Sequence, residues 1–154
     1  MTTHPFCKLE TGKGATFVVT PCPGTQGVAL FSSIKQLKEQ GVSAVLTIMS
    51  DQELIQSGAC DLEAVCESTE VKWLQLSVPS GAGLGDELQS IVQNQIPTIM
   101  AAMSGGKVIA IHSKGGSGRT RFVIGLLLIA LGMSKEEAGM LVKSVSGPIT
   151  QLPY

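Results

Sequence analysis

One stretch of the sequence combines the residue types that bind an anion. It runs from Lys107 to Leu131 and reads KVIAIHSKGGSGRTRFVIGLLLIAL. A β-branched apolar run precedes a glycine-rich loop and a long apolar segment, which predicts a buried strand, a tight turn and a helix buried in a core. Glycines let the loop aim its backbone N–H groups inward, and the helix start adds the positive end of its dipole. A loop built in this way holds a phosphate.

The spacing inside this loop makes the interpretation more specific. His112 is followed directly by Ser113, and five residues separate Ser113 from Arg119 and Thr120. A guanidinium on the first turn of the helix can donate two parallel hydrogen bonds to an oxyanion that backbone amides already bind. The residues expected around the phosphate are Ser113, Lys114, Gly115, Gly116, Ser117, Gly118 and Arg119.

The segment HSKGGSGRT resembles the signature of the protein tyrosine and dual-specificity phosphatases, which is His-Cys-five residues-Arg-Ser/Thr. The order of the segments SDQEL, WLQLSVP and the signature is most similar to the branch related to the cyclin-dependent-kinase-associated phosphatase. The resemblance implies hydrolysis of phosphotyrosine or phosphoserine/threonine through a cysteinyl-phosphate, without a metal or other cofactor. It also implies that His112 braces the loop and favours the thiolate, and that Thr120 faces the nucleophile and helps it leave.

The nucleophile position holds Ser113 instead of cysteine. A thiolate is activated by the same amides and helix end that bind phosphate, whereas a serine hydroxyl is far more basic and needs a neighbouring base. We therefore expect this form to bind phosphate without turnover. Two explanations remain open: an introduced Cys-to-Ser substitution that traps a complex, or a natural pseudophosphatase that binds phosphorylated partners. The otherwise intact loop favours the first.

The general acid has no direct match at the position that the resemblance implies. By resemblance, an aspartate in a loop after the third predicted strand protonates the leaving oxygen, but the matching segment Val78-Pro79-Ser80 has no carboxylate. The nearest candidates are Asp86 and Glu87, and we assign Asp86 as the candidate catalytic acid. Its alternative role is an ordinary helix N-cap, because Gln89 follows three residues later. If neither carboxylate reaches the leaving oxygen, aryl phosphates should be the preferred substrates.

The remaining sequence predicts an α/β fold with a central, mostly parallel sheet of four or five strands flanked by helices. We expect a single phosphatase-like domain over residues 1–154, with an irregular lead-in over residues 1–15. Strands are expected at 17–19, 43–49, 71–78 and from 107 to the signature. Helices are expected at 30–40, from a Ser50–Glu53 capping box to about Gly58, at 62–68, from Asp86 with a kink or break at Pro97, at 119–131, and after a second capping box at Ser134–Glu137.

Composition limits the other classes of function. The net charge of −1 gives no electrostatic case for nucleic acid, and the longest apolar run is too short for a membrane span of about 20 residues. The four cysteines lack a CxxC pair or histidine companions, so we expect free thiols and no zinc site. A nucleotide-binding P-loop is a weaker alternative, because Arg119-Thr120 stands where that motif needs Lys-Ser/Thr. With no signal-like N-terminus, we expect a cytoplasmic protein whose ligands are phosphorylated proteins, small phosphate esters or inorganic phosphate.

Overall fold

The computed structural model describes residues 3–79, 84–114 and 118–144, and these form a sheet with helices on both faces. The sheet has five strands in the order β1-β2-β5-β3-β4. Strand β1 pairs with β2 in antiparallel fashion, and the other neighbours are parallel. The strands are β1 (Cys7–Glu10), β2 (Thr16–Val19), β3 (Val42–Ile48), β4 (Lys72–Gln75) and β5 (Val108–Ser113). The predicted α/β fold with a mostly parallel sheet is confirmed.

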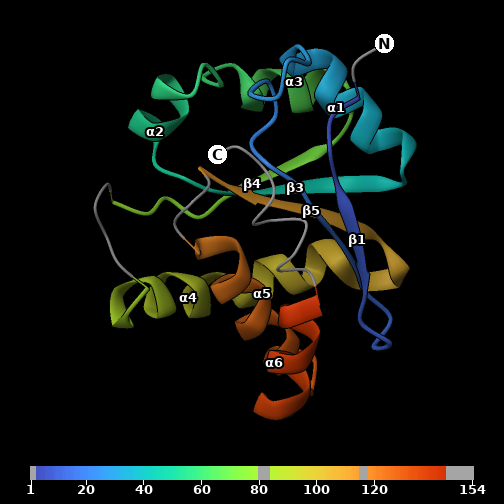
Figure 1. Ribbon diagram of the computed structural model, residues 1–154, viewed down its shortest axis with the longest axis vertical. Helices are drawn as coiled ribbons and strands as arrows, with labels where there is room; N and C mark the ends of the chain where they lie inside the picture. Colours follow the sequence, from blue (N-terminus) through green and yellow to red (C-terminus); the bar gives the residue numbers. More distant parts are fainter. Residues whose placement is uncertain (1–2, 80–83, 115–117, 145–154) are drawn as a thin grey trace.

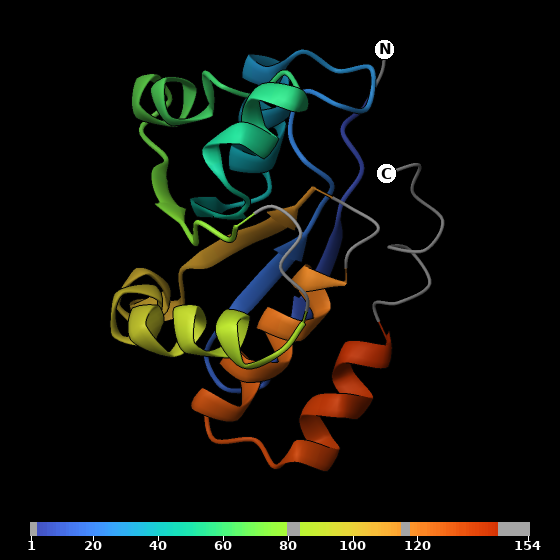
Figure 2. The same cartoon turned by 90° about the vertical axis from the view of Figure 1, so that its left-hand side faces the viewer.

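The helices form two layers, as the two views in Figures 1 and 2 show. One layer contains α1 (Leu30–Glu39), α2 (Asp51–Gln56) and α3 (Leu62–Ser68). The other contains α4 (Asp86–Met103), α5 (Arg119–Ala130) and α6 (Lys135–Ser144), with a short 3-10 helix, η1 (Ser104–Gly106), after α4. Both predicted capping boxes are present: Ser50 and Glu53 at the start of α2, and Ser134 and Glu137 before α6.

The central strand β5 contributes side chains to the hydrophobic cores on both faces of the sheet. Ile109 and Ile111 belong to the core under α4, α5 and α6, whereas Ala110 between them belongs to the core under α1 and α3. Phe17 and Val18 of β2 divide in the same way. Successive side chains of a strand point to opposite faces, so a strand in the middle of three layers is apolar at every position. This burial fixes β5 and therefore the place where the chain leaves it at Ser113.

Three sequence predictions about local structure were wrong or incomplete. The lead-in over residues 1–15 contains β1, a short edge strand that pairs with β2. Strand β4 is shorter than the predicted 71–78. Helix α4 continues through Pro97, so the local break that was one of the two predicted outcomes is absent. The proline removes one backbone hydrogen bond of the helix, while the apolar face of the helix stays packed.

Helix α5 is buried on one face only. Its residues Val123, Ile124, Leu127 and Leu128 are fully buried, whereas Phe122 and Leu126 are half-buried and Ile129 is exposed. The sequence predicted burial on every side, because the segment is apolar throughout. In the structure α5 packs beside α4 and α6 in one layer, so part of its surface faces solvent.

Candidate phosphate-binding site

The predicted phosphate loop lies at the carboxyl end of β5, where open parallel sheets bind ligands. Strand β5 ends at Ser113 and α5 begins at Arg119. Gly118 is the N-cap of α5 and has φ +76°, a left-handed conformation that side chains rarely adopt. The predicted binding residues Gly115, Gly116 and Ser117 lie outside the described residues. The described ends of the loop therefore define the site.

The hydroxyls of Ser113 and Thr120 are in contact. Thr120 Oγ1 donates to Ser113 Oγ over 3.0 Å, and the two side chains are largely buried. Ser113 is 5 % exposed, so solvent reaches little of this residue. Within the described residues, no imidazole or carboxylate hydrogen-bonds to Ser113 Oγ. The Ser113 hydroxyl thus has a donor beside it but lacks a base that would ionise it.

Arg119 is a buried arginine held by the neighbouring strand and helix. Its Nη1 donates to Glu53 Oε1 over 2.9 Å and to the carbonyl of Ile48 over 3.4 Å, and the side chain is only 2 % exposed. Ile48 pairs with Ser113 across β3 and β5, so Arg119 reaches back beside the strand that carries Ser113. The guanidinium is therefore fixed in orientation next to the nucleophile position.

Glu53 joins the start of α2 to the phosphate loop. Its Oε1 accepts from the backbone N–H of Ser50 over 3.0 Å as part of the capping box, and it also accepts from Arg119. Burial alone would raise the pKa of Glu53, but the hydrogen bond and charge of Arg119, the Ser50 N–H and the charge of Lys114 together lower it below its usual value. Glu53 is consequently a carboxylate at neutral pH.

Lys114 is the second cation beside this carboxylate. Its Nζ lies 3.6 Å from Glu53 Oε2, and its side chain is 46 % exposed. Lys114 and Arg119 thus place two cationic side chains against one carboxylate. This balance suits an oxyanion.

His112 is fixed by side chains from two other strands. Its Nε2 lies 2.7 Å from Thr47 Oγ1, and the indole Nε1 of Trp73 donates to the same oxygen over 2.8 Å. Burial lowers the pKa of His112 to about 3; the backbone of Ser113 opposes this shift, and the charge of His4 adds to it. His112 is therefore a neutral imidazole at neutral pH.

A second buried histidine lies near the amino end of the chain. His4 is fully buried, and its Nε2 lies 2.6 Å from Thr20 Oγ1 and 3.2 Å from the carbonyl of Pro21. Burial lowers the pKa of His4, and the backbone of Pro21 opposes this shift. Neither histidine of the chain is thus placed to act as a cation at the loop.

The amino end of α4 approaches the loop. A Cβ built on Gly118 would lie 3.1 Å from Leu84 Cδ1, so the chain just before α4 meets the start of α5. Asp86 is two residues further along, exposed, in the first turn of α4. The alternative N-cap role of Asp86 is wrong, because Gly85 occupies the cap and no side chain caps this helix. The expected Ser80 lies outside the described residues.

Three side chains of this site were not predicted from the sequence. Glu53 was recognised only as part of a capping box, and Thr47 and Trp73 had no predicted role. All three reach the signature across many intervening residues, since Glu53 and Arg119 are 66 positions apart. A helix-start carboxylate placed directly after a buried strand was the only available signal for Glu53.

The described residues contain no group of three or more His, Cys, Asp or Glu side chains that could hold a metal ion. All four cysteines are free, and burial raises the pKa of both Cys22 and Cys66 to about 12. These two thiols lie in the core under α1 and α3, so they are inert as nucleophiles. Among the described helices, none has the length and apolar character needed to span a membrane.

Comparison with known proteins gives similarity in structure but not in sequence. No protein-family model matches the chain, and no curated protein matches its sequence. Among solved structures, the fold resembles kinase-associated phosphatase carrying a serine in place of its catalytic cysteine, with a TM-score of 0.80 and 18 % identity over 96 % of this chain and 86 % of that one.

Two further structures have the same fold. A putative protein tyrosine phosphatase from Leishmania major matches with a TM-score of 0.68 and 14 % identity, covering 99 % of this chain and 100 % of that one. PTPMT1 in complex with PI(5)P matches with a TM-score of 0.64 and 18 % identity, covering 90 % of this chain and 81 % of that one. The fold is thus that of the protein tyrosine and dual-specificity phosphatases.

Proposed function

We propose that residues 1–154 form a phosphatase domain of the cysteine-dependent type, present here in a form that binds phosphate esters without hydrolysing them. With cysteine at position 113, the domain would hydrolyse phosphotyrosine or phosphoserine/threonine in proteins. The observation that carries this proposal is the arrangement of Ser113, Arg119 and Thr120 at the carboxyl end of β5, with the guanidinium fixed by Glu53.

The chemistry follows from the positions of these groups. In the cysteine form, the thiolate attacks phosphorus, a phosphorus–sulfur bond forms, and the ester oxygen leaves with a proton from the general acid. Arg119 and the loop amides stabilise the charge on the equatorial oxygens. Water then attacks the cysteinyl-phosphate and gives its proton to the general acid, which is now a carboxylate. The phosphorus–sulfur bond breaks, and the Thr120 hydroxyl, which lies 3.0 Å from Ser113 Oγ in the present form, donates to the departing thiolate. No step needs a metal.

Asp86 is the carboxylate that we assign as general acid. The contact between Leu84 and Gly118 supports this choice, because it brings the first turn of α4 to the loop. Glu53 is unsuited to the role, since Arg119 and Lys114 hold it as a carboxylate. A general acid must start protonated and reach the leaving oxygen.

The proposal is tested with the Ser113→Cys variant and an aryl phosphate, assayed with and without a chelator. We expect hydrolysis in the variant, none in the Ser113 protein, and no effect of the chelator. The matched control adds Arg119→Lys to Ser113→Cys, which keeps the charge but loses the planar fork. An inactive Ser113→Cys protein, or one that requires metal, would remove the enzyme assignment.

The alternative function is a natural pseudophosphatase that captures phosphorylated partners. The buried Ser113 hydroxyl without a base favours it, because the same site binds an oxyanion without turnover. Phosphopeptide binding by the Ser113 protein, together with a serine codon in the source gene, would support this function. Because PTPMT1 is seen in complex with PI(5)P, phosphoinositides belong in the same substrate panel as phosphopeptides.

A further inference from the structure

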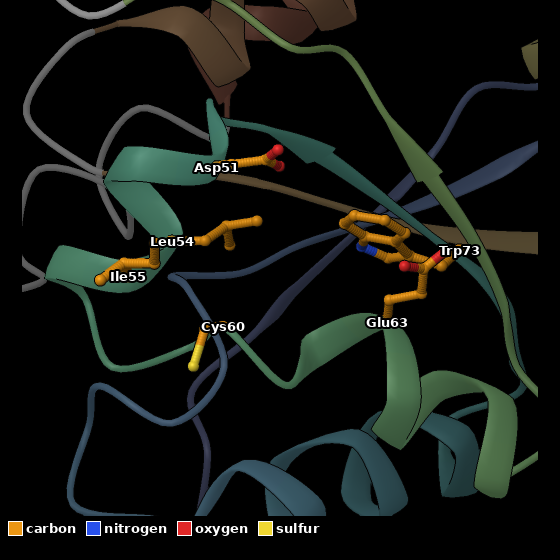
Figure 3. Close-up of a pocket in the computed structure, with 6 residues that line it drawn as sticks. All are labelled: Asp51, Leu54, Ile55, Cys60, Glu63 and Trp73. Atoms are coloured by element: carbon orange, nitrogen blue, oxygen red, sulfur yellow. The ribbon is translucent and has the colours of Figure 1, made fainter.

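A small pocket outside the phosphate-binding site lies between α2, α3 and the edge strand β4. It has a volume of about 170 Å³. The residues that line it are Asp51, Leu54, Ile55, Cys60, Glu63 and Trp73. Figure 3 shows the indole of Trp73 on one side of the pocket, with the side chains of Asp51 and Leu54 directed toward it from α2. The carboxyl group of Glu63 lies beside the ring. An aromatic wall, apolar side chains and two acidic groups thus meet in one cavity.

The aromatic wall is fixed in orientation. The indole Nε1 of Trp73 donates to Thr47 Oγ1 over 2.8 Å, and Thr47 is fully buried. Trp73 itself is half-buried, so part of its ring can be reached from the pocket. Because the indole N–H is already bonded, the ring offers a ligand only its apolar, electron-rich surface. Such a surface binds apolar groups and cations.

The two acidic side chains of the pocket have no cationic partner in the described structure. No ion pair among the described residues involves Asp51 or Glu63, and the described lining of the pocket contains no Lys, Arg or His. Asp51 Oδ1 accepts from Gln75 Nε2 over 2.9 Å, which holds the carboxyl group in place without neutralising it. The pocket therefore places two acidic groups next to an aromatic ring, and the ligand that matches both is a cation.

The size of the pocket and the shape of the cation favour an arginine side chain. One long side chain can enter a cavity of about 170 Å³, whereas a helix of about 10 Å in diameter cannot. A guanidinium is planar, so it can stack on the indole and donate from its edge to carboxylates at the same time. Ile55, which is 66 % exposed and borders the pocket, can cover the apolar stem of the same side chain.

Helix α2 lies between this pocket and the phosphate-binding site. Asp51, Leu54 and Ile55 have the spacing i, i+3, i+4, so they share the face of α2 that lines the pocket. Glu53 lies on another face and binds Arg119. The same short helix therefore borders the pocket on one side and holds the phosphate-binding arginine on the other.

The strand register gives the separation of the two sites. Ser113 of β5 pairs with Ile48 of β3, and Trp73 of β4 pairs with Val45, three residues before Ile48. Two strand spacings of about 4.8 Å and three residues of about 3.3 Å each place Ser113 and Trp73 about 14 Å apart. An extended polypeptide covers this distance in about four residues. One peptide can therefore reach both sites.

We propose that this pocket binds one arginine side chain of a polypeptide ligand, with the guanidinium between Trp73, Asp51 and Glu63. Binding of the arginine depends only on the pocket. Its use in substrate selection rests on the function proposed above, in which the phosphorylated residue occupies the loop. The arginine then lies about four residues from the phosphorylated residue of the same peptide.

The first experiment follows the fluorescence of Trp73, which is the only tryptophan of the chain. The Ser113 protein is titrated with an unphosphorylated peptide that contains one arginine, and with the same peptide carrying citrulline, a neutral side chain of nearly the same shape. We expect a saturable change with the arginine peptide and binding about tenfold weaker with the citrulline peptide. Equal binding of the two peptides, or no change with either, would overturn the proposal.

Two variants and one control test the acidic groups of the pocket. Glu63→Gln and Asp51→Asn each remove a negative charge with little change in shape, and each should reduce the preference for arginine over citrulline several-fold. Because they lie on different helices, a local disturbance of one helix cannot explain a loss in both. The control is Glu67→Gln, which removes the same charge from an exposed position of α3 outside the pocket and should keep the preference. A preference that survives both variants, or that Glu67→Gln abolishes equally, would contradict the proposal.

The last experiment tests substrate selection with phosphopeptides that carry the arginine about two to six residues from the phosphorylated residue, on either side. We expect the arginine form to bind the Ser113 protein about tenfold tighter than its citrulline form at a spacing of about four residues, and Glu63→Gln to remove this gain. Phosphopeptides that bind equally at every spacing would refute the role in selection and leave phosphate binding intact. If no phosphopeptide binds through its phosphate while the fluorescence response to arginine remains, the proposed function is wrong and the pocket assignment stands.

Discussion

The ion pair between Glu53 and Arg119 can be tested by a single substitution that preserves shape. In Glu53→Gln the amide oxygen can still accept from Arg119 Nη1 and from the Ser50 N–H, and the amide NH2 replaces the oxygen that faces the part-exposed Lys114. The substitution thus removes the negative charge with almost no change in shape. Both partners are 2 % exposed, which means that solvent cannot replace that charge. The variant therefore isolates the electrostatic part of the interaction from its packing.

The size of the effect follows from the type of hydrogen bond. A hydrogen bond to a charged group contributes about 1.5–3 kcal/mol and a neutral one about 0.5–1.5 kcal/mol, whereas removing one partner of a buried pair outright costs about 3–5 kcal/mol. Because Gln keeps the contact, we expect the free energy of unfolding to fall by about 2 kcal/mol at pH 7. Urea denaturation without phosphate measures this change.

The pH dependence gives an independent check with a fixed sign. The folded-state pKa of Glu53 is lowered, so the unfolded chain binds its proton first as the pH falls. The stabilisation by Glu53 is thus complete above about 4.3, the ordinary pKa of a glutamate, and is lost as the pH falls through the folded-state value. The difference between the unmodified chain and Glu53→Gln should shrink over the same range.

The matched control is Glu67→Gln, which removes the same charge from an exposed position of α3. It should change the free energy of unfolding by no more than about 0.5 kcal/mol at any pH. If Glu53→Gln destabilises the protein no more than Glu67→Gln, or if its effect persists unchanged in acid, then Glu53 does not hold Arg119 as a charged partner.

Three further substitutions test the loop and its acid. Gly118→Ala should lower the free energy of unfolding by about 1–2 kcal/mol and weaken phosphate binding in a titration, because Gly118 has φ +76° and lies close to Leu84. The control is Gly132→Ala, at φ +103° in open space, which should lower the free energy of unfolding without changing phosphate binding. In the Ser113→Cys background, Asp86→Asn should reduce kcat about a hundredfold for alkyl phosphates but little for aryl phosphates, and equal losses would contradict its role as acid. Thr120→Val in that background should slow the second step, so a burst of the aryl product in rapid mixing would appear, and its absence would count against the role of Thr120.

The sequence predicted the fold because local signals and the overall pattern agreed. Ile109 and Ile111 mark a buried strand, the Ser50–Glu53 and Ser134–Glu137 pairs mark helix starts, and both kinds of signal act within a few residues. Strand β1 was not predicted because it is only four residues long and has exposed positions, as is typical of a strand at a sheet edge. Its pairing with β2 is a tertiary effect that no local pattern in the lead-in reveals.

The sequence also predicted that Ser113, Arg119 and Thr120 lie at the junction of β5 and α5, but not what holds them there. The contact between Ser113 and Thr120 follows from a strand and a helix joined by a short loop. The partners of Arg119 and His112 are 66 and 65 residues away, so their identity depends on the order of strands in the sheet. Strand order is set by packing and crossover geometry, and spacing within one motif carries no information about it.

The central claim is that the turn between β5 and α5 binds an oxyanion through its amides and Arg119. The most direct measurement is an NMR titration of the Ser113 protein with orthophosphate, following the backbone amides of Lys114, Gly118 and Arg119. We expect saturable shifts that centre on these amides and disappear in Arg119→Lys. Amides that stay unperturbed at high phosphate, or shifts that survive Arg119→Lys unchanged, would contradict it.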